Sequence, residues 1–239
     1  SMADIRMAEG WGTRAELTVL APSFLGDRVT NYWPPRPPAA ARKEILQGSR
    51  VTFMLRAAWW LRRHRSEVDV VFVLDNLTAA LAATLARWMG GPPPVLQVGR
   101  STLEYLRCQR GSRLWLLRYV VAWALIQVNE RSAAGIAAVS DHCAVQSRAR
   151  NGRVWSIPGY GVDLAKFRPG DKATARKRLS LPLDKPIVML RSRIAPEKDP
   201  ETFLAAVARL RADGRQFTAL YMGGEIDQMT ALAEAAGVS

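Results

Sequence analysis

A short stretch around residue 190 constrains the fold of this chain more than any other. Residues 186–190 form an apolar run that starts with a proline and ends before an arginine, and a run of this length predicts a buried strand of a parallel sheet. Residues 199–201, Asp-Pro-Glu, have the order typical of a helix start, with a capping Asp, a proline at the first helical position and an acid in the first turn. The loop between them carries Arg193 and Lys198. The stretch therefore predicts a strand, a basic loop and a helix.

Arg193 and Lys198 are candidate ligands for a diphosphate. Open α/β sheets bind ligands at the carboxyl ends of their strands, which is where this loop is expected to lie. Arginine offers a planar pair of donors and lysine a compact positive charge, and both suit phosphate oxygens. The alternative is that both are ordinary solvated loop charges, and their spacing alone does not decide between the two.

Two motifs in the chain resemble signatures of one enzyme family. Residues 192–199 have the sequence SRIAPEKD, which is similar to the G/S-R-L-x-x-E-K-G/D signature that opens the C-terminal domain of family 4 glycosyltransferases of GT-B architecture. Residues 157–169, IPGYGVDLAKFRP, resemble that family's I-P-N-G-V-D-x-x-x-F-x-P linker, with Gly159 and Tyr160 standing where the family usually has a single Asn. The order and separation of the two motifs also match the family.

The resemblance implies an α/β fold of GT-B type, with two Rossmann-like domains built on parallel sheets. The alternation of strand and helix patterns along the chain independently predicts parallel sheets. We expect an N-terminal, acceptor-side domain over residues 1–156, a linker over residues 157–175, and the first part of a C-terminal nucleotide-sugar-binding domain over residues 176–239.

The same resemblance implies that parts of the two-domain unit lie outside these 239 residues. Residues 16–22 resemble the family's second strand, so its first strand would precede Ser1. The family's E-x7-E element would follow Ser239. On this interpretation the chain holds half of a donor site, and we expect the isolated chain not to catalyse transfer.

Short apolar runs and helical periodicity place the remaining elements. The proline-rich residues 23–49 predict a loop with little regular structure. The expected strands are residues 16–22, 68–74, 95–98, 135–139, 186–192 and 217–222, and the expected helices are residues 51–65, 77–88, 113–128, 200–213 and 226–236.

Further candidate site residues follow other expected strands. The pair Gly223-Gly224 resembles the family's G-x-G turn and would let the backbone approach the donor nucleotide closely, although an ordinary turn explains it equally well. The family's N-terminal histidines have no counterpart at the corresponding strand ends, where the polar residues are Asp75, Asn76 and Arg100. These three are the acceptor-side candidates.

No catalytic residue can be assigned from the sequence. His142 follows the strand expected at residues 135–139, and we expect it to cap or pack locally, because no acid or nucleophile is visible beside it. The two histidines and two cysteines have no metal-ligand spacing. The resemblance likewise implies catalysis without a metal or cofactor.

The chain is strongly basic, with a net charge of +13 from 28 arginines and 6 lysines against 21 acids. This charge favours anionic partners, which include nucleotide phosphates, anionic lipid headgroups and nucleic acid. Nucleic acid is disfavoured, because the basic residues alternate with apolar residues at helical spacing and form no basic arm.

Two expected helices are candidates for contact with an anionic membrane. Residues 51–65 place Trp59 and Trp60 beside several arginines, although an amphipathic helix that packs its tryptophan side on the sheet would have the same pattern. Residues 119–128 are uncharged but too few to cross a bilayer, so we expect a buried or membrane-apposed helix there.

The resemblance implies transfer of a sugar from a nucleoside diphosphate sugar to an acceptor, with retention, and a lipid-linked compound is one option for that acceptor. Arg193 and Lys198 would stabilise the departing diphosphate. The alternative function is a basic, tryptophan-rich module that binds membranes without catalysis. Because Cys108 and Cys143 form no disulfide framework and no signal peptide or long apolar run is visible, we expect a cytoplasmic protein, peripheral to the inner face of the membrane if it binds lipid.

Overall fold

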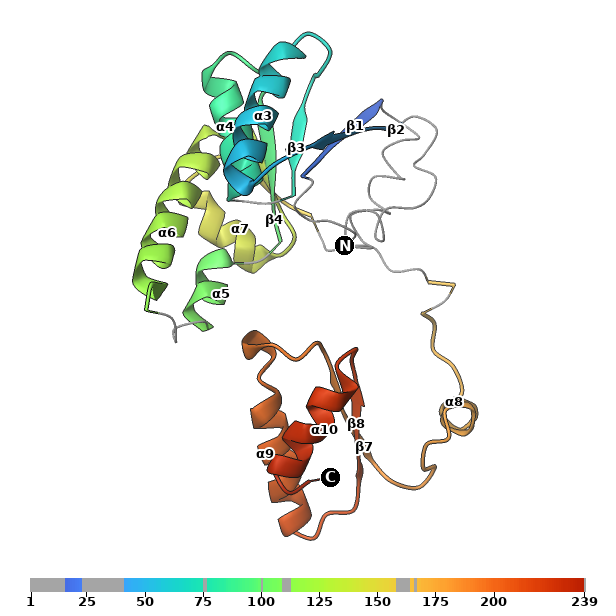
Figure 1. Cartoon of the computed structure of the whole chain (residues 1–239). Helices are drawn as coiled ribbons and strands as arrows, with labels where there is room; N and C mark the ends of the chain where they lie inside the picture. Colours follow the sequence, from blue (N-terminus) through green and yellow to red (C-terminus); the bar gives the residue numbers. More distant parts are fainter. Residues whose placement is uncertain are drawn as a thin grey trace. The chain divides into compact units, whose positions relative to one another are not determined.

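The computed structural model describes residues 16–22, 41–74, 77–99, 101–108, 113–157, 164–165 and 167–238. The chain divides into two compact units, the first comprising residues 1–106 and 113–161 and the second residues 107–112 and 162–239. In each unit helices pack beside parallel strands (Figure 1). The α/β class and the parallel sheets expected from the sequence are therefore confirmed.

The first unit is built on a four-stranded parallel sheet with the order β3-β4-β5-β6. Neighbouring strands follow one another along the chain, so each connection has to cross over, and helices form these crossovers. The strands are β3 (Val71–Val73), β4 (Pro94–Val98), β5 (Gly135–Ala138) and β6 (Val154–Ser156). The helices are α3 (Arg50–Arg63), α4 (Thr78–Trp88), α5 (Thr102–Cys108), α6 (Trp115–Ser132) and α7 (Asp141–Arg148).

The core of the first unit depends on small side chains in α4. This helix contacts both α3 and α6, and its alanines pack against Val73 of β3 and Leu96 of β4. Leu96 is fully buried, as is Ile136, its register partner on β5. Because alanine side chains are short, α4 lies close to both the sheet and the flanking helices.

A separate two-stranded parallel sheet precedes α3. It pairs β1 (Leu17–Pro22) with β2 (Ala41–Leu46). The loop expected over residues 23–49 is therefore wrong for β2, whose sequence ARKEIL has no apolar alternation that would predict a strand. Pairing with β1 provides the backbone hydrogen bonds instead. The proline-rich residues 23–40 lie outside the described residues.

The second unit contains a parallel pair of strands, β7 (Ile187–Arg191) and β8 (Thr218–Met222), flanked by helices (Figure 1). Its core lies between the strands and two helices, and includes Leu204, Val207 and Met229. The helical elements are α8 (Lys172–Arg178), the short 3-10 helix η2 (Pro196–Lys198), α9 (Pro200–Ala212) and α10 (Ile226–Ala235).

Across the part of the chain that the structure describes, no helix is both long enough and apolar enough to cross a membrane.

Candidate functional site

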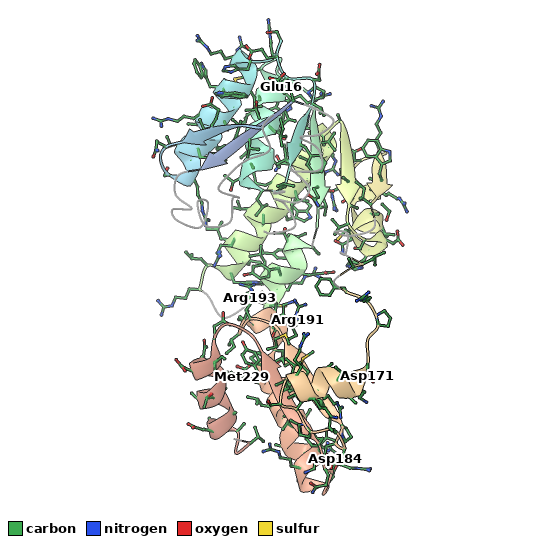
Figure 2. All side chains as sticks on the ribbon, turned by 90° about the vertical axis from the view of Figure 1, so that its right-hand side faces the viewer. Glu16, Asp171, Asp184, Arg191, Arg193 and Met229 are labelled. Carbon is green, nitrogen blue, oxygen red and sulfur yellow. The ribbon has the colours of Figure 1, made fainter. Side chains whose placement is uncertain are left out.

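The carboxyl ends of β7 and β8 form one edge of the second unit. Arg191 and Met222 are the last residues of the two strands and are register partners, so the loops that follow leave from the same edge. In Figure 2, Arg191 and Arg193 lie at one end of this strand pair and Asp184, just before β7, lies at the other. This edge carries the predicted basic loop and the predicted glycine turn.

Arg193 forms an ion pair with Glu197, with 2.7 Å between Nη2 and Oε1. The short helix η2 turns the chain back and brings Glu197 into reach of Arg193. The Arg193 side chain is 64% exposed and the Glu197 side chain 17%. Because a guanidinium carries five N–H donors, one bond to Glu197 orients the group and leaves other donors for an anion.

Lys198 is the last residue of η2 and is exposed. Its backbone N–H donates to the carbonyl of Ala195 at 2.8 Å, while its ammonium group has no hydrogen-bond or ion-pair partner within the described ranges. The next residue, Asp199, has a left-handed backbone with φ of 46° and caps α9 by accepting the N–H of Thr202 at 3.2 Å. The cap holds the end of the basic loop in place.

The two glycines after β8 have different surroundings. A β-carbon placed on Gly223 would lie less than 3.0 Å from the Tyr221 hydroxyl and from the backbone carbonyl of Ser192, so this glycine lets the two loops meet. A β-carbon on Gly224 would have no atom within 4 Å. At Gly223 the backbone therefore lies close to another part of the protein. Of the two glycines, only Gly224 faces open space that a ligand could occupy.

The Tyr221 hydroxyl lies beside the glycine turn and donates to Glu225 Oε2 at 3.3 Å. Loss of hydration raises the pKa of Tyr221, and the negative charge of Glu225 raises it further. Tyr221 therefore stays a neutral hydrogen-bond donor at physiological pH.

His142 has an acidic partner, Glu104, although the sequence showed no acid beside it. Its Nε2 lies 3.2 Å from Glu104 Oε1, and Gln146 Nε2 donates to the same oxygen at 3.1 Å. Glu104 is on α5, after β4, and His142 is on α7, after β5, so the cluster lies beyond the carboxyl ends of two parallel strands. The His142 and Glu104 side chains are 64% and 49% exposed. Ser140, not His142, caps α7.

Comparison with known proteins finds glycosyltransferases among the relatives of this chain. No protein-family model matches the chain. The chain is 34% identical over 151 residues to a D-inositol 3-phosphate glycosyltransferase of Mycolicibacterium paratuberculosis, a match that covers 63% of this chain and 29% of that relative. The chain is a homologue of glycosyltransferases. It thus spans less than a third of this relative's length.

Solved structures place this glycosyltransferase homologue in the GT-B fold. A glycosyltransferase from Rickettsia africae matches with a TM-score of 0.58 at 14% identity, covering 99% of this chain and 61% of that one. A Listeria monocytogenes protein assigned as a UDP-N-acetylglucosamine 2-epimerase matches with a TM-score of 0.56 at 12% identity, covering 100% of this chain and 62% of that one. At these identities the likeness shows the fold alone.

The three residues predicted to contact the acceptor have no structural description. Asp75, Asn76 and Arg100 lie outside the described residues. They follow β3 and β4, two neighbouring parallel strands. Their role stays a prediction. No group of three or more potential metal ligands occurs among the residues that the structure describes.

The two adjacent tryptophans of α3 have different surroundings, one against the core and one on the surface. Trp60 is half-buried, packs against the core and stacks on His64 with 4.0 Å between ring centroids. Trp59 is 58% exposed, and the guanidinium of Arg63 lies 5.3 Å from its ring centroid. One tryptophan thus packs inward, as in an ordinary amphipathic helix, and the other remains on the surface.

Proposed function

We propose that this chain is part of an enzyme that transfers a hexosyl group from a nucleoside diphosphate sugar to an acceptor, with retention of configuration, in polysaccharide or glycoconjugate biosynthesis. The observation that carries the proposal is the edge formed by β7 and β8. There an oriented arginine, an exposed lysine and an open glycine occur together in a homologue of glycosyltransferases. Ligands of open α/β sheets bind at such an edge.

The chemistry of the proposal concerns the leaving group. As the bond between the anomeric carbon and the diphosphate oxygen breaks, negative charge grows on the diphosphate while a bond forms to an acceptor hydroxyl. Arg193 would donate hydrogen bonds to the diphosphate oxygens, and Lys198 would neutralise their charge. Removing either should cost about 3 kcal/mol of transition-state stabilisation, the size seen for single electrostatic donors.

For the acceptor, we propose a lipid-linked hydroxyl compound. The Mycolicibacterium relative is named for D-inositol 3-phosphate, but it matches this chain over only 29% of its own length. The support for a lipid-linked compound is the basic, apolar surface of the first unit, which suits peripheral association with an anionic membrane. We further propose that the enzyme works in the cytoplasm, where the free thiols of Cys108 and Cys143 stay reduced.

A turnover assay of the full-length enzyme with a panel of nucleotide sugars tests the proposal, because the isolated chain is expected not to catalyse transfer. We expect release of nucleoside diphosphate, and a product whose anomeric configuration, measured by NMR, matches that of the donor. The variant Arg193→Ala/Lys198→Ala should lose this activity. Arg209→Ala, an exposed arginine in the last turn of α9, is the control, because α9 runs away from the carboxyl edge. Full activity in the double variant would contradict the proposed site.

A membrane-binding module without catalysis is the second candidate. It is favoured by the exposed apolar side chains on α6. Binding of the full-length protein to anionic vesicles, together with no nucleotide-sugar turnover, would support it over the enzyme.

A further inference from the structure

Helix α6 has an apolar outer face, which is unusual for a helix on a protein surface. Such helices normally present polar residues outward. Six large apolar side chains of α6 are each between 38% and 63% exposed: Leu116, Leu117, Val120, Val121, Trp123 and Val128. Contiguous exposed apolar surface of this kind marks a site of interaction.

The opposite face of α6 is fixed to the rest of the first unit. Ala122 and Ile126 are buried there, and Asn129 is fully buried. The Asn129 Oδ1 accepts a hydrogen bond from the hydroxyl of Thr84 on α4 at 3.1 Å. Because this side of the helix is packed against the rest of the unit from Ala122 to Glu130, an occupant has to contact the opposite side. In Figure 1, α6 is at the outside of its unit.

The charges of α6 indicate what that occupant is. Arg113 precedes the helix, Arg118 is exposed in its first turns and Arg131 is exposed at its end. The single acid in the helix, Glu130, has a side chain only 1% exposed and pairs with Arg150 at 2.8 Å. The outer surface of α6 therefore presents apolar and positive groups and no negative ones.

A second copy of the chain fits this surface poorly. In a symmetric dimer the same patch meets itself, which would bring the arginines of one copy towards those of the other. An anionic bilayer offers both complements, because its headgroups are negative and its acyl region is apolar.

We propose that α6 docks the protein, side on, to the surface of an anionic lipid bilayer, with the face around Leu117 and Trp123 in the headgroup region and the flanking arginines on the lipid phosphates. This inference rests on the membrane association proposed above and names the surface that makes it. It does not depend on the identity of the sugar donor.

Vesicle flotation tests the proposal with four proteins. The first is the wild type, and the second replaces Leu116, Leu117, Val120 and Trp123 with Gln. The third, Arg113→Gln/Arg118→Gln, removes charge and leaves the apolar face intact. The fourth, Leu179→Gln/Leu183→Gln, removes exposed apolar side chains from the second unit and is the matched control.

Each protein is mixed with vesicles of phosphatidylcholine alone or with an equal amount of phosphatidylglycerol. We expect wild type and control to float with the anionic vesicles roughly tenfold more than with the neutral ones. The four-residue α6 variant should lose roughly tenfold in bound fraction, and the arginine variant should lose the preference for anionic lipid. Circular dichroism establishes that each variant is folded.

The possible failures are distinguishable. If the wild type does not float with anionic vesicles, the membrane association itself is contradicted. If the wild type and both α6 variants float equally well, only the α6 surface is contradicted. A third outcome is that the wild type does not bind vesicles and runs as a dimer in gel filtration, while the four-residue α6 variant runs as a monomer. In that case a second copy covers α6, and the proposal is overturned. Nucleoside diphosphate binding, measured in parallel, should be unchanged in all four proteins.

Discussion

The two glycines at the end of β8 should respond very differently to the same substitution. In Gly223→Ala, the added methyl group would overlap the Tyr221 hydroxyl and the backbone carbonyl of Ser192. The tyrosine can rotate, but the carbonyl belongs to the loop that carries Arg193, so the loop has to move. Overpacking of this kind costs about 1–3 kcal/mol. Alanine restricts the unfolded chain more than glycine does, and this lower entropy of the unfolded state offsets about 0.4–1 kcal/mol of the overpacking cost.

The expected net destabilisation of the second unit is therefore about 1–2 kcal/mol for Gly223→Ala. Gly224→Ala meets no atom within 4 Å, so its effect should lie between zero and a small gain. Hydrogen exchange of the β7 and β8 amides measures the difference locally. A loss of about 1.4 kcal/mol corresponds to tenfold faster exchange.

The same pair also separates packing from ligand approach. If a nucleotide lies against Gly224 as proposed, Gly224→Ala should weaken nucleoside diphosphate binding without changing exchange in β7 or β8. Equal exchange rates in the two variants would refute the packing argument for Gly223.

Three further outcomes are expected. Because Arg193 and Lys198 are exposed, salt should screen their attraction for a nucleoside diphosphate. The Debye length falls from about 10 Å at 0.1 M salt to about 3 Å at 1 M, so the affinity should weaken several-fold between these concentrations. Calorimetry at both salt concentrations measures this. Arg150→Ala leaves the buried Glu130 carboxylate without its partner and should destabilise the first unit by about 3 kcal/mol in urea unfolding, followed by tryptophan fluorescence, since all tryptophans precede residue 162; an unchanged midpoint would contradict this. Hydrogen bonds from Thr174, first from its hydroxyl and then from its backbone N–H, lower the pKa of Asp171 below 3.8. The Asp171 cap should therefore stabilise α8 above about pH 4 and lose this effect as the pH falls further. Amide exchange of α8 should detect this pH dependence, and Asp171→Asn should abolish it.

The elements that the sequence predicts well are those whose signals are local. The apolar run before Arg191 and the Asp-Pro-Glu start of α9 lie within fifteen residues, and the structure has β7 and α9 at the expected places. Strand β2 was missed because its hydrogen-bonding partner, β1, precedes it by some twenty residues and its own sequence, ARKEIL, has no apolar alternation. Pairing over such a separation leaves no periodic pattern in one strand alone.

The site follows the same division. The ion pair of Arg193 with Glu197 joins residues four apart within one short loop, so this contact is local in sequence, although only Glu197 lies in the helix η2. The pairing of His142 with Glu104 joins residues 38 apart, which lie on helices from two different crossover connections. No local sequence pattern predicts such a contact. The sequence likewise does not distinguish Gly223 from Gly224, because the difference lies in the packing of Tyr221 and Ser192 around Gly223 alone.

Arg193 and Lys198 are proposed to hold the diphosphate of the donor. Calorimetric titration with UDP, GDP and ADP tests it without knowledge of the sugar or the acceptor. We expect micromolar or tighter binding of at least one of them to the wild type and to Arg209→Ala, and a loss of at least about 100-fold in Arg193→Ala/Lys198→Ala, because each charged hydrogen bond contributes about 1.5–3 kcal/mol. Equal affinity of the double variant and the wild type would contradict it.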